Sequence, residues 1–146
     1  MKFLFWSVLF HFLFIHFLFP QESDDEIFVV KKGNVGFVSD APLELIEASS
    51  DELKGVLKLS DRTFAFGVDI RTFEGFNSPL QRIHFNENYM ESDKYEKGTF
   101  QGKIIEEINL TQPGNHRVRA KGILSLHGVE QQRIIRCRVR AGNNKI

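Results

Sequence analysis

The chain has 146 residues, of which 42% are hydrophobic, and its 19 basic side chains balance its 19 acidic ones. This length and composition fit one globular domain with an ordinary core. The single cysteine excludes a disulfide framework, and the formal net charge of zero gives no compositional support for nucleic-acid binding.

The amino-terminal segment differs in composition from the rest of the chain. Lys2 precedes an uncharged apolar run over residues 3–19, which ends at Pro20. One positive residue before a long apolar block is typical of a secretory signal peptide. We therefore predict a signal peptide over residues 1–21, one domain over residues 22–146, and a periplasmic or secreted protein. Because the residues before Pro20 are bulky and make a poor cleavage site, retention of the run as an N-terminal membrane anchor is the alternative.

Beyond residue 26 the apolar residues recur mostly with a period of two, which is typical of strands with one buried face. We predict an opening hairpin over residues 26–40 with its turn at Gly33–Asn34. Residues 43–48 form a further short apolar segment, either strand or irregular. Strands are also predicted over residues 54–60 and 63–72, and the alternation is clearest in the second of these.

One segment departs from this alternation. Ser78 suits a helix N-cap, and Pro79 suits the first helical position, where its missing N–H costs nothing. A modest apolar stripe with helical spacing begins at Leu80. We therefore predict one short helix over residues 79–90.

The last third of the chain combines apolar alternation with strong positive charge. Strands resume at residue 98, and turns are predicted at residues 112–115 and 127–130. Residues 135–140 (IRCRVR) alternate apolar residues with arginine. We interpret these arginines as the solvated face of an outer strand; the alternative is contact with lipid phosphate at a membrane surface, which suits the planar guanidinium group. The free Cys137 is interpreted as a small buried apolar residue.

Many short antiparallel strands joined by tight turns, with one apolar face, predict a sandwich or a barrel. A barrel of about eight strands is wide enough either to be packed solid or to hold one small ligand. Periodicity alone does not distinguish these two outcomes.

Two motifs resemble the YceI-like family. Residues 85–104, FNENYMESDKYEKGTFQGKI, are similar to a signature in which S-D-K-Y-P-x-x-x-F-x-G precedes a central strand, and residues 122–129, GILSLHGV, are similar to a G-x-L-x-[IL]-H-G-V strand and turn. The order of the other segments extends the similarity over residues 27–140. The resemblance implies an all-β fold with one short helix, a lipocalin-like antiparallel barrel, and export to the periplasm or beyond. It also implies an elongated apolar cavity, which in some members holds a polyisoprenoid or another long amphiphile, and no established enzymatic activity.

The chain departs from the family pattern at two places. Glu96 stands where the family has proline after Tyr95, a loop change with little expected effect on rigidity. Family members continue with further strands beyond the equivalent of Arg140, so we expect the C-terminal strands to be missing and the barrel to be incompletely closed, with unpaired edges. Closure by a partner, such as a homodimer formed through the open sheet edge, is the alternative.

We expect the apolar face of the strands to line a ligand cavity. The predicted function is an exported protein that sequesters or carries a polyisoprenoid, quinone or other long-chain amphiphile. The alternative is a solid-cored envelope protein that acts through its surface and takes no ligand. Neither a cofactor nor a nucleic-acid partner is expected. The candidate lining residues are Val35, Phe37, Leu57, Leu59, Phe64, Phe66, Val68, Ile70, Phe100, Ile104, Leu124 and Leu126.

Patterns for catalysis and metal binding are weak. His84, His116 and His127 lack the close spacing of paired metal ligands, and His127 is interpreted as a turn residue with local hydrogen bonds. The sequence contains no G-x-S-x-G elbow, and no spacing brings a nucleophile to a base. We therefore predict no enzymatic activity, no catalytic residue and no metal site.

Overall fold

The computed structural model describes residues 26–41 and 44–142 of the chain. The predicted signal peptide and the start of the predicted domain at residue 22 lie outside the described residues. The described part contains a six-stranded antiparallel sheet in which each strand pairs with its neighbours in the sequence. The strands are β1 (Ile27–Ala41), β2 (Glu44–Lys58), β3 (Thr63–Asp69), β4 (Lys97–Ile104), β5 (Gly114–Leu126) and β6 (Val129–Ala141).

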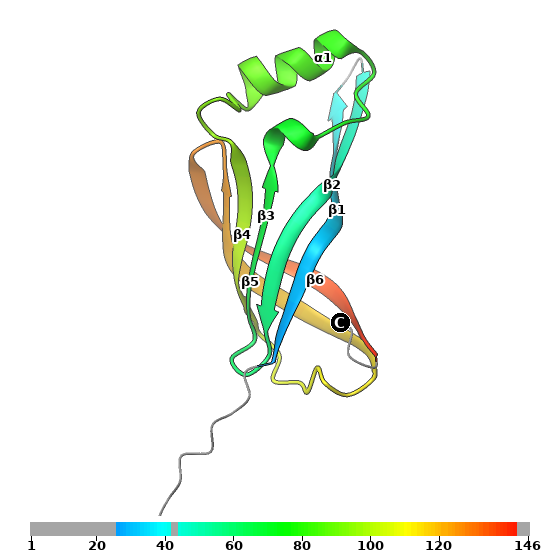
Figure 1. Cartoon of the computed structure of the whole chain (residues 1–146), viewed down its shortest axis with the longest axis vertical. Helices are drawn as coiled ribbons and strands as arrows, with labels where there is room; N and C mark the ends of the chain where they lie inside the picture. Colours follow the sequence, from blue (N-terminus) through cyan, green and yellow to red (C-terminus); the bar gives the residue numbers. More distant parts are fainter. Residues whose placement is uncertain (1–25, 42–43, 143–146) are drawn as a thin grey trace, which may run out of the picture.

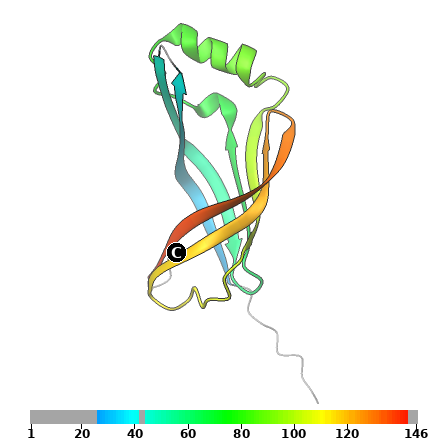
Figure 2. The same ribbon diagram turned by 180° about the vertical axis from the view of Figure 1, so that it is seen from behind.

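The sheet twists and curls into a half-barrel. Figures 1 and 2 show β5 and β6 crossing on the other side of the interior from β1 and β2. β1 and β6 are the edge strands, and within the described ranges no pairing joins them. The expected all-β fold, an incompletely closed lipocalin-like antiparallel barrel with one short helix, is confirmed.

The beginning of the sheet differs from the prediction at Gly33–Asn34. The turn predicted there is wrong, because β1 continues through both residues and pairs along its length with β2. The register shift before Gly33 adds one residue in β1 and the shift after it adds one in β2, and glycine within a strand marks such a bulge as readily as a turn. The long β2 offers a partner to both halves of β1, whereas a turn at Gly33–Asn34 would pair the two halves only with each other.

The chain between β3 and β4 forms the helical cover of one end of the half-barrel, which we call the helix end (Figure 1). It contains a short 3₁₀-helix, η1 (Ile70–Thr72), then α1 (Pro79–His84) and a π-helical turn, η2 (Phe85–Tyr89). The predicted helix and its start are confirmed: the Ser78 side chain accepts a hydrogen bond from the Gln81 N–H at 3.2 Å, and Pro79 is the first helical residue. None of the helices in the described ranges has the length and hydropathy needed to cross a bilayer.

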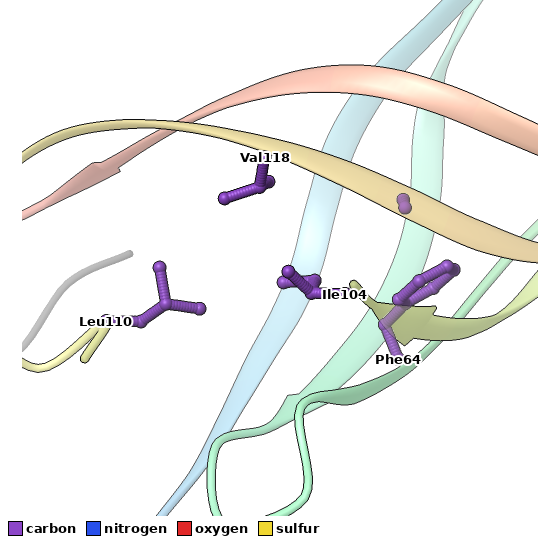
Figure 3. Close-up of a cluster of buried hydrophobic side chains, with 5 residues drawn as sticks. Phe64, Ile104, Leu110 and Val118 are labelled. Atoms are coloured by element: carbon purple, nitrogen blue, oxygen red, sulfur yellow. The ribbon is translucent and has the colours of Figure 1, made fainter. Parts of the chain in front are cut away.

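The interior contains two apolar clusters. One cluster, which we call the opposite cluster, lies at the opposite end of the half-barrel from α1. It is centred on the buried Phe64, Ile104, Leu110 and Val118, whose side chains lie between the strands and the loop after β4 (Figure 3). The cluster at the helix end is centred on Ala48, Val68, Ile70 and Phe73. Half-buried apolar side chains pack against both clusters.

Candidate functional site

A partly open apolar cavity of about 470 Å³ lies inside the half-barrel at the helix end. This volume falls in the range of about 300–1,000 Å³ that is typical of small-molecule sites. Among the described residues that form its wall, Thr99 is the only polar one, so a ligand there would be held mainly by removal of apolar surface from water. The wall consists of Val35, Gly36, Phe37, Leu53, Phe66, Gly67, Val68, Ile70, Phe73, Phe85, Met90, Gly98, Thr99, Phe100, Leu124 and Leu126.

The structure brings most of the predicted lining residues to this cavity. These are Val35, Phe37, Phe66, Val68, Ile70, Phe100, Leu124 and Leu126. It does not bring the others there: Phe64 and Ile104 are buried in the opposite cluster, and Leu57 and Leu59 pack against that cluster. The same face of the strands therefore lines a cavity at one end and a packed core at the other.

Aromatic rings separate the two regions. Phe66 and Phe100 line the cavity and also contact the opposite cluster. The Phe64 ring lies 5.0 Å from the Phe100 ring and 5.8 Å from the Phe66 ring between centroids. Rings at these separations are in favourable contact, so Phe66 and Phe100 form the floor of the cavity and the Phe64 ring lies directly beneath it.

Sequence reasoning missed several residues of the wall. Leu53 lies in the part of β2 between the two segments that were predicted separately, and Phe73, Phe85 and Met90 come from the connection between β3 and β4. A period-two search does not find residues outside strands. The one available signal was the concentration of phenylalanine between residues 73 and 85.

Phe85 holds the helical cover against the sheet. Its ring stacks on Phe37 of β1 at 5.3 Å and 14°, and it lies 5.0 Å from Phe76 and 6.0 Å from Phe73. The apolar stripe predicted from Leu80 onward takes no part in this contact, because Leu80 and Ile83 are exposed. Phe37 also lies 5.7 Å from Phe73 and 6.3 Å from Phe76, so at about 0.5–1.5 kcal/mol for each ring pair Phe85 is one of three rings that attach the cover to the sheet.

Gly98 of β4 keeps part of the cavity open. A Cβ atom placed on it would lie 3.1 Å from Leu126 Cδ1, 3.5 Å from Ile70 Cδ1 and 3.8 Å from Val68 Cγ1. All three of these side chains line the cavity. A larger residue at position 98 would therefore project into the hollow and displace its wall.

Polar groups gather where the helical cover meets the β5–β6 turn. His127 Nε2 lies 2.7 Å from Glu91 Oε2, and the His127 ring meets the edge of Tyr95 at 4.8 Å. The expectation of purely local hydrogen bonds for His127 is wrong, because Glu91 lies 36 residues away in the sequence. The hydrogen bond to Tyr95, assisted by the charges of Tyr95 and Glu91, raises the pKa of Lys94.

This contact, which we call the polar clasp (Glu91, Lys94, Tyr95 and His127), borders the cavity. Met90 precedes Glu91 and Leu126 precedes His127, and both apolar residues belong to the cavity wall. The turn fits closely, because a Cβ on Gly128 would lie 2.5 Å from Tyr95 Cε1, and its φ of +69° also favours glycine. The clasp places hydrogen-bonding groups beside an otherwise apolar hollow.

Histidines and carboxylates do not assemble a metal site in residues 26–41 and 44–142: no group of three or more His, Cys, Asp or Glu side chains could hold an ion there. His84 lies in α1, His116 near the start of β5 and His127 in the β5–β6 turn. Cys137 is half-buried against the opposite cluster.

No protein-family model matches this sequence, and no curated protein matches it. Among solved structures, the chain is similar to one described as a polyisoprenoid binding domain from Saccharophagus degradans implicated in plant cell wall breakdown. The TM-score is 0.61 at 15% sequence identity, and the match covers 77% of this chain and 65% of that domain. This chain therefore spans less than two thirds of the length of that domain. The similarity establishes the fold, and the YceI-like fold that the sequence motifs predicted is confirmed.

Proposed function

We propose that this protein binds a long-chain amphiphile, such as an isoprenoid, a quinone or a fatty compound, and shields its apolar tail in the cavity at the helix end. The observation that carries the proposal is a hollow of about 470 Å³ to whose wall the described part of the chain contributes a single polar residue. The similarity in fold to a polyisoprenoid binding domain supports the same class of ligand.

Burial of apolar surface supplies the driving force. Each Å² of apolar ligand surface removed from water contributes about 25 cal/mol, or about 0.8 kcal/mol for each buried CH₂ group. The cost of ordering a flexible tail offsets part of this gain. Because the wall offers almost no hydrogen-bonding groups, we expect selection by tail shape rather than by tail chemistry.

The polar clasp gives the ligand an orientation. An amphiphile with its tail against Met90 and Leu126 brings its polar head towards Glu91 and His127, the next residue along the chain from each. A head group left in the apolar interior would lose its hydrogen bonds to water at a cost of several kcal/mol. We therefore expect the head group at the clasp and the tail towards Phe66 and Phe100.

A larger hollow elsewhere on the molecule suits such a ligand less well. It has a volume of about 840 Å³ and lies beside Lys31, Glu52, Lys54 and Lys97. Charged side chains keep water in place, so tail burial there would gain little. The alternative is a solid-cored protein that acts only through its surface. The packed opposite cluster agrees with this alternative, whereas the cavity at the helix end favours binding of a ligand.

Export is part of the proposal. The apolar run over residues 3–19 supports action in the periplasm or outside the cell. In such a compartment a water-insoluble molecule needs a carrier to pass between membranes. The proposed activity requires no catalytic residue.

The direct test is extraction of the purified protein with organic solvent, followed by mass spectrometry of the extract. We expect one class of amphiphile to be recovered, and we expect the emptied protein to take up a hydrophobic fluorescent dye. Gly98→Val should reduce dye uptake, because the added side chain would narrow the cavity where Leu126, Ile70 and Val68 line it. Ala65→Leu is the matched control, because Ala65 lies on the exposed side of β3, and this variant should retain uptake. An empty wild-type protein that takes up no dye would reject the proposal.

A further inference from the structure

The pairing of β5 with β6 places arginines directly opposite one another. Arg117 faces Arg138, and Arg119 faces Arg136. Residues separated by two along a strand share a side of the sheet, so the four guanidinium groups lie on one exposed surface, which we call the arginine face. Directly opposite side chains have Cβ atoms about 4.5–5.5 Å apart, and like charges there repel.

Little of this positive charge is compensated within the protein. Glu106 accepts hydrogen bonds from Arg119 Nε and from the Arg119 backbone N–H, each at 2.7 Å, and these bonds lower the pKa of the Glu106 carboxyl. For Arg117, Arg136 and Arg138, no carboxylate of the described residues lies within ion-pair distance. The arginine face is therefore a repulsive arrangement that an external anion would relieve.

The arginine face is hollowed as well as charged. A shallow depression of about 350 Å³ is bordered by the four arginines, Glu106, Val118 and Cys137. The planar guanidinium group forms paired hydrogen bonds with phosphate oxygens, and several such groups around one depression can hold more than one phosphate. The chemistry of the surface therefore selects phosphate-like anions.

Exposed isoleucines border the same surface. Ile134 pairs with Lys121, and Ile123 pairs with Gln132, so both isoleucines lie on the side of the sheet that carries the arginines. Ile134 is 56% exposed and Ile123 is 37% exposed. Apolar side chains beside basic ones are typical of surfaces that lie in the interface of a bilayer, where both kinds of group find partners. A soluble polyanion would leave the isoleucines in water.

We propose that the arginine face docks the protein on an anionic bilayer, with the guanidinium groups on lipid phosphates and with Ile134 and Ile123 at the level of the head groups. Charge complementarity provides the attraction, and the isoleucines distinguish a membrane from a soluble anion. The docking surface lies on the outside of β5 and β6 and involves no residue of the cavity wall, so it stands independently of the proposed ligand.

The test is sedimentation of the full chain with vesicles that contain phosphatidylglycerol and phosphatidylcholine, compared with vesicles of phosphatidylcholine alone. We expect stronger binding to the anionic vesicles and release of this excess binding as salt shortens the Debye length from about 10 Å at 0.1 M to about 3 Å at 1 M. Arg117→Gln combined with Arg138→Gln should weaken partitioning about 30-fold, because each charge near an anionic surface contributes about 1 kcal/mol.

The matched control is Lys54→Gln combined with Lys97→Gln, which removes two exposed charges from another region and should change partitioning less than about threefold. Any binding through residues 3–19 is common to all these proteins and should also occur with phosphatidylcholine alone. Equal losses in both double variants would overturn the proposal. Ile134→Ser should weaken vesicle binding several-fold while leaving retention on immobilised heparin unchanged.

A second measurement separates docking from folding. Because Arg117 and Arg138 repel each other, their joint replacement by glutamine should leave the thermal unfolding midpoint unchanged or higher. A lower midpoint would indicate a structural role for the two arginines and would count against the proposal. Retention of the wild type on heparin without binding to anionic vesicles would identify a soluble polyanion as the partner and would also overturn it.

Discussion

The two ends of the half-barrel share the same strands but differ in how their interior is filled. At the opposite end, the loop between β4 and β5 places Leu110, which is only 3% exposed, in one cluster with Ile104 and Val118 (Figure 3). At the helix end, the connection between β3 and β4 lies across the opening. Its Phe85 and Met90 side chains line the cavity and do not fill it. The comparison teaches that the connections, and not the strand pattern, decide whether this interior is solid or hollow.

The largest expected effect is at the packed end. Phe64→Ala should lower the free energy of unfolding by about 3–5 kcal/mol, because it removes a buried ring from the packed cluster and leaves a cavity there. Urea denaturation measures this loss. Dye uptake by the molecules that remain folded should be retained, since the ring lies below the cavity floor. A loss under about 1 kcal/mol would contradict close packing at this end.

Ligand should act only through the helix end. A bound amphiphile at about 100 times its dissociation constant should stabilise the wild type by about 2.7 kcal/mol, which appears as a higher unfolding midpoint. Gly98→Val should show a smaller shift, because the added methyl groups take up part of the binding space beside Leu126 and Ile70. An equal shift in this variant would place the ligand outside the cavity.

A smaller loss is expected from the cover of the cavity. Phe85→Ala should cost about 2 kcal/mol, less than Phe64→Ala, because Phe85 is half-buried and already borders a hollow. The cover should also open more often, so dye should dissociate faster in stopped-flow measurements. Leu80→Ala on the exposed side of α1 is the matched control and should change stability by less than about 0.5 kcal/mol. Unchanged dissociation in Phe85→Ala would show that the cover does not control access.

The smallest effects concern pH, and they have opposite signs at the two ends. Hydrogen bonds from Thr63 lower the pKa of Asp61, and those from Arg119 lower the pKa of Glu106, so both carboxylates contribute stability above their ordinary pKa values of about 4. That contribution is lost as the pH falls through the lowered values. The raised pKa of Lys94 has the reverse consequence: its contribution is complete below about 10.4 and is lost as the pH rises beyond it.

Unfolding midpoints at pH 3–5 and at pH 9–11 test these signs. Glu106→Gln should make the unfolding midpoint depend slightly less on pH between pH 3 and 5, and Lys94→Met should make it depend slightly less on pH between pH 9 and 11. Lys94 is exposed, and Asp61 and Glu106 are only half-buried, so the changes should be small and should shrink further in salt. A steeper dependence of the midpoint on pH in either variant would contradict the sign assigned to that group's contribution to stability.

The strands of this protein could be predicted from the sequence where burial alternates. Phe64, Phe66 and Phe100 follow the pleat, and the structure places them on one inner face. Gly33 was misinterpreted because glycine permits both a turn and a bulge, and the choice depends on the length of β2, a partner that the local sequence does not reveal.

The cavity could be predicted only in part. The strand residues of its wall share a face that periodicity identifies, but the division between that wall and the packed cluster depends on where Leu110 and Phe85 come to lie. Both residues belong to connections, whose paths are set by tertiary contacts rather than by local pattern. The arginine face needed the register of β5 and β6, because only the register shows which arginines stand opposite each other.

The order of the strands in the sheet has a consequence for how the molecule forms. Each strand from β2 onward pairs with the strand that precedes it in the chain, so only one connection separates the two partners of each pair. Such nearest-neighbour pairing lowers the entropy lost in bringing partners together and favours rapid zippering. A chain that emerges amino terminus first can therefore assemble β1, β2 and β3 while the arginine-rich hairpin is still being delivered.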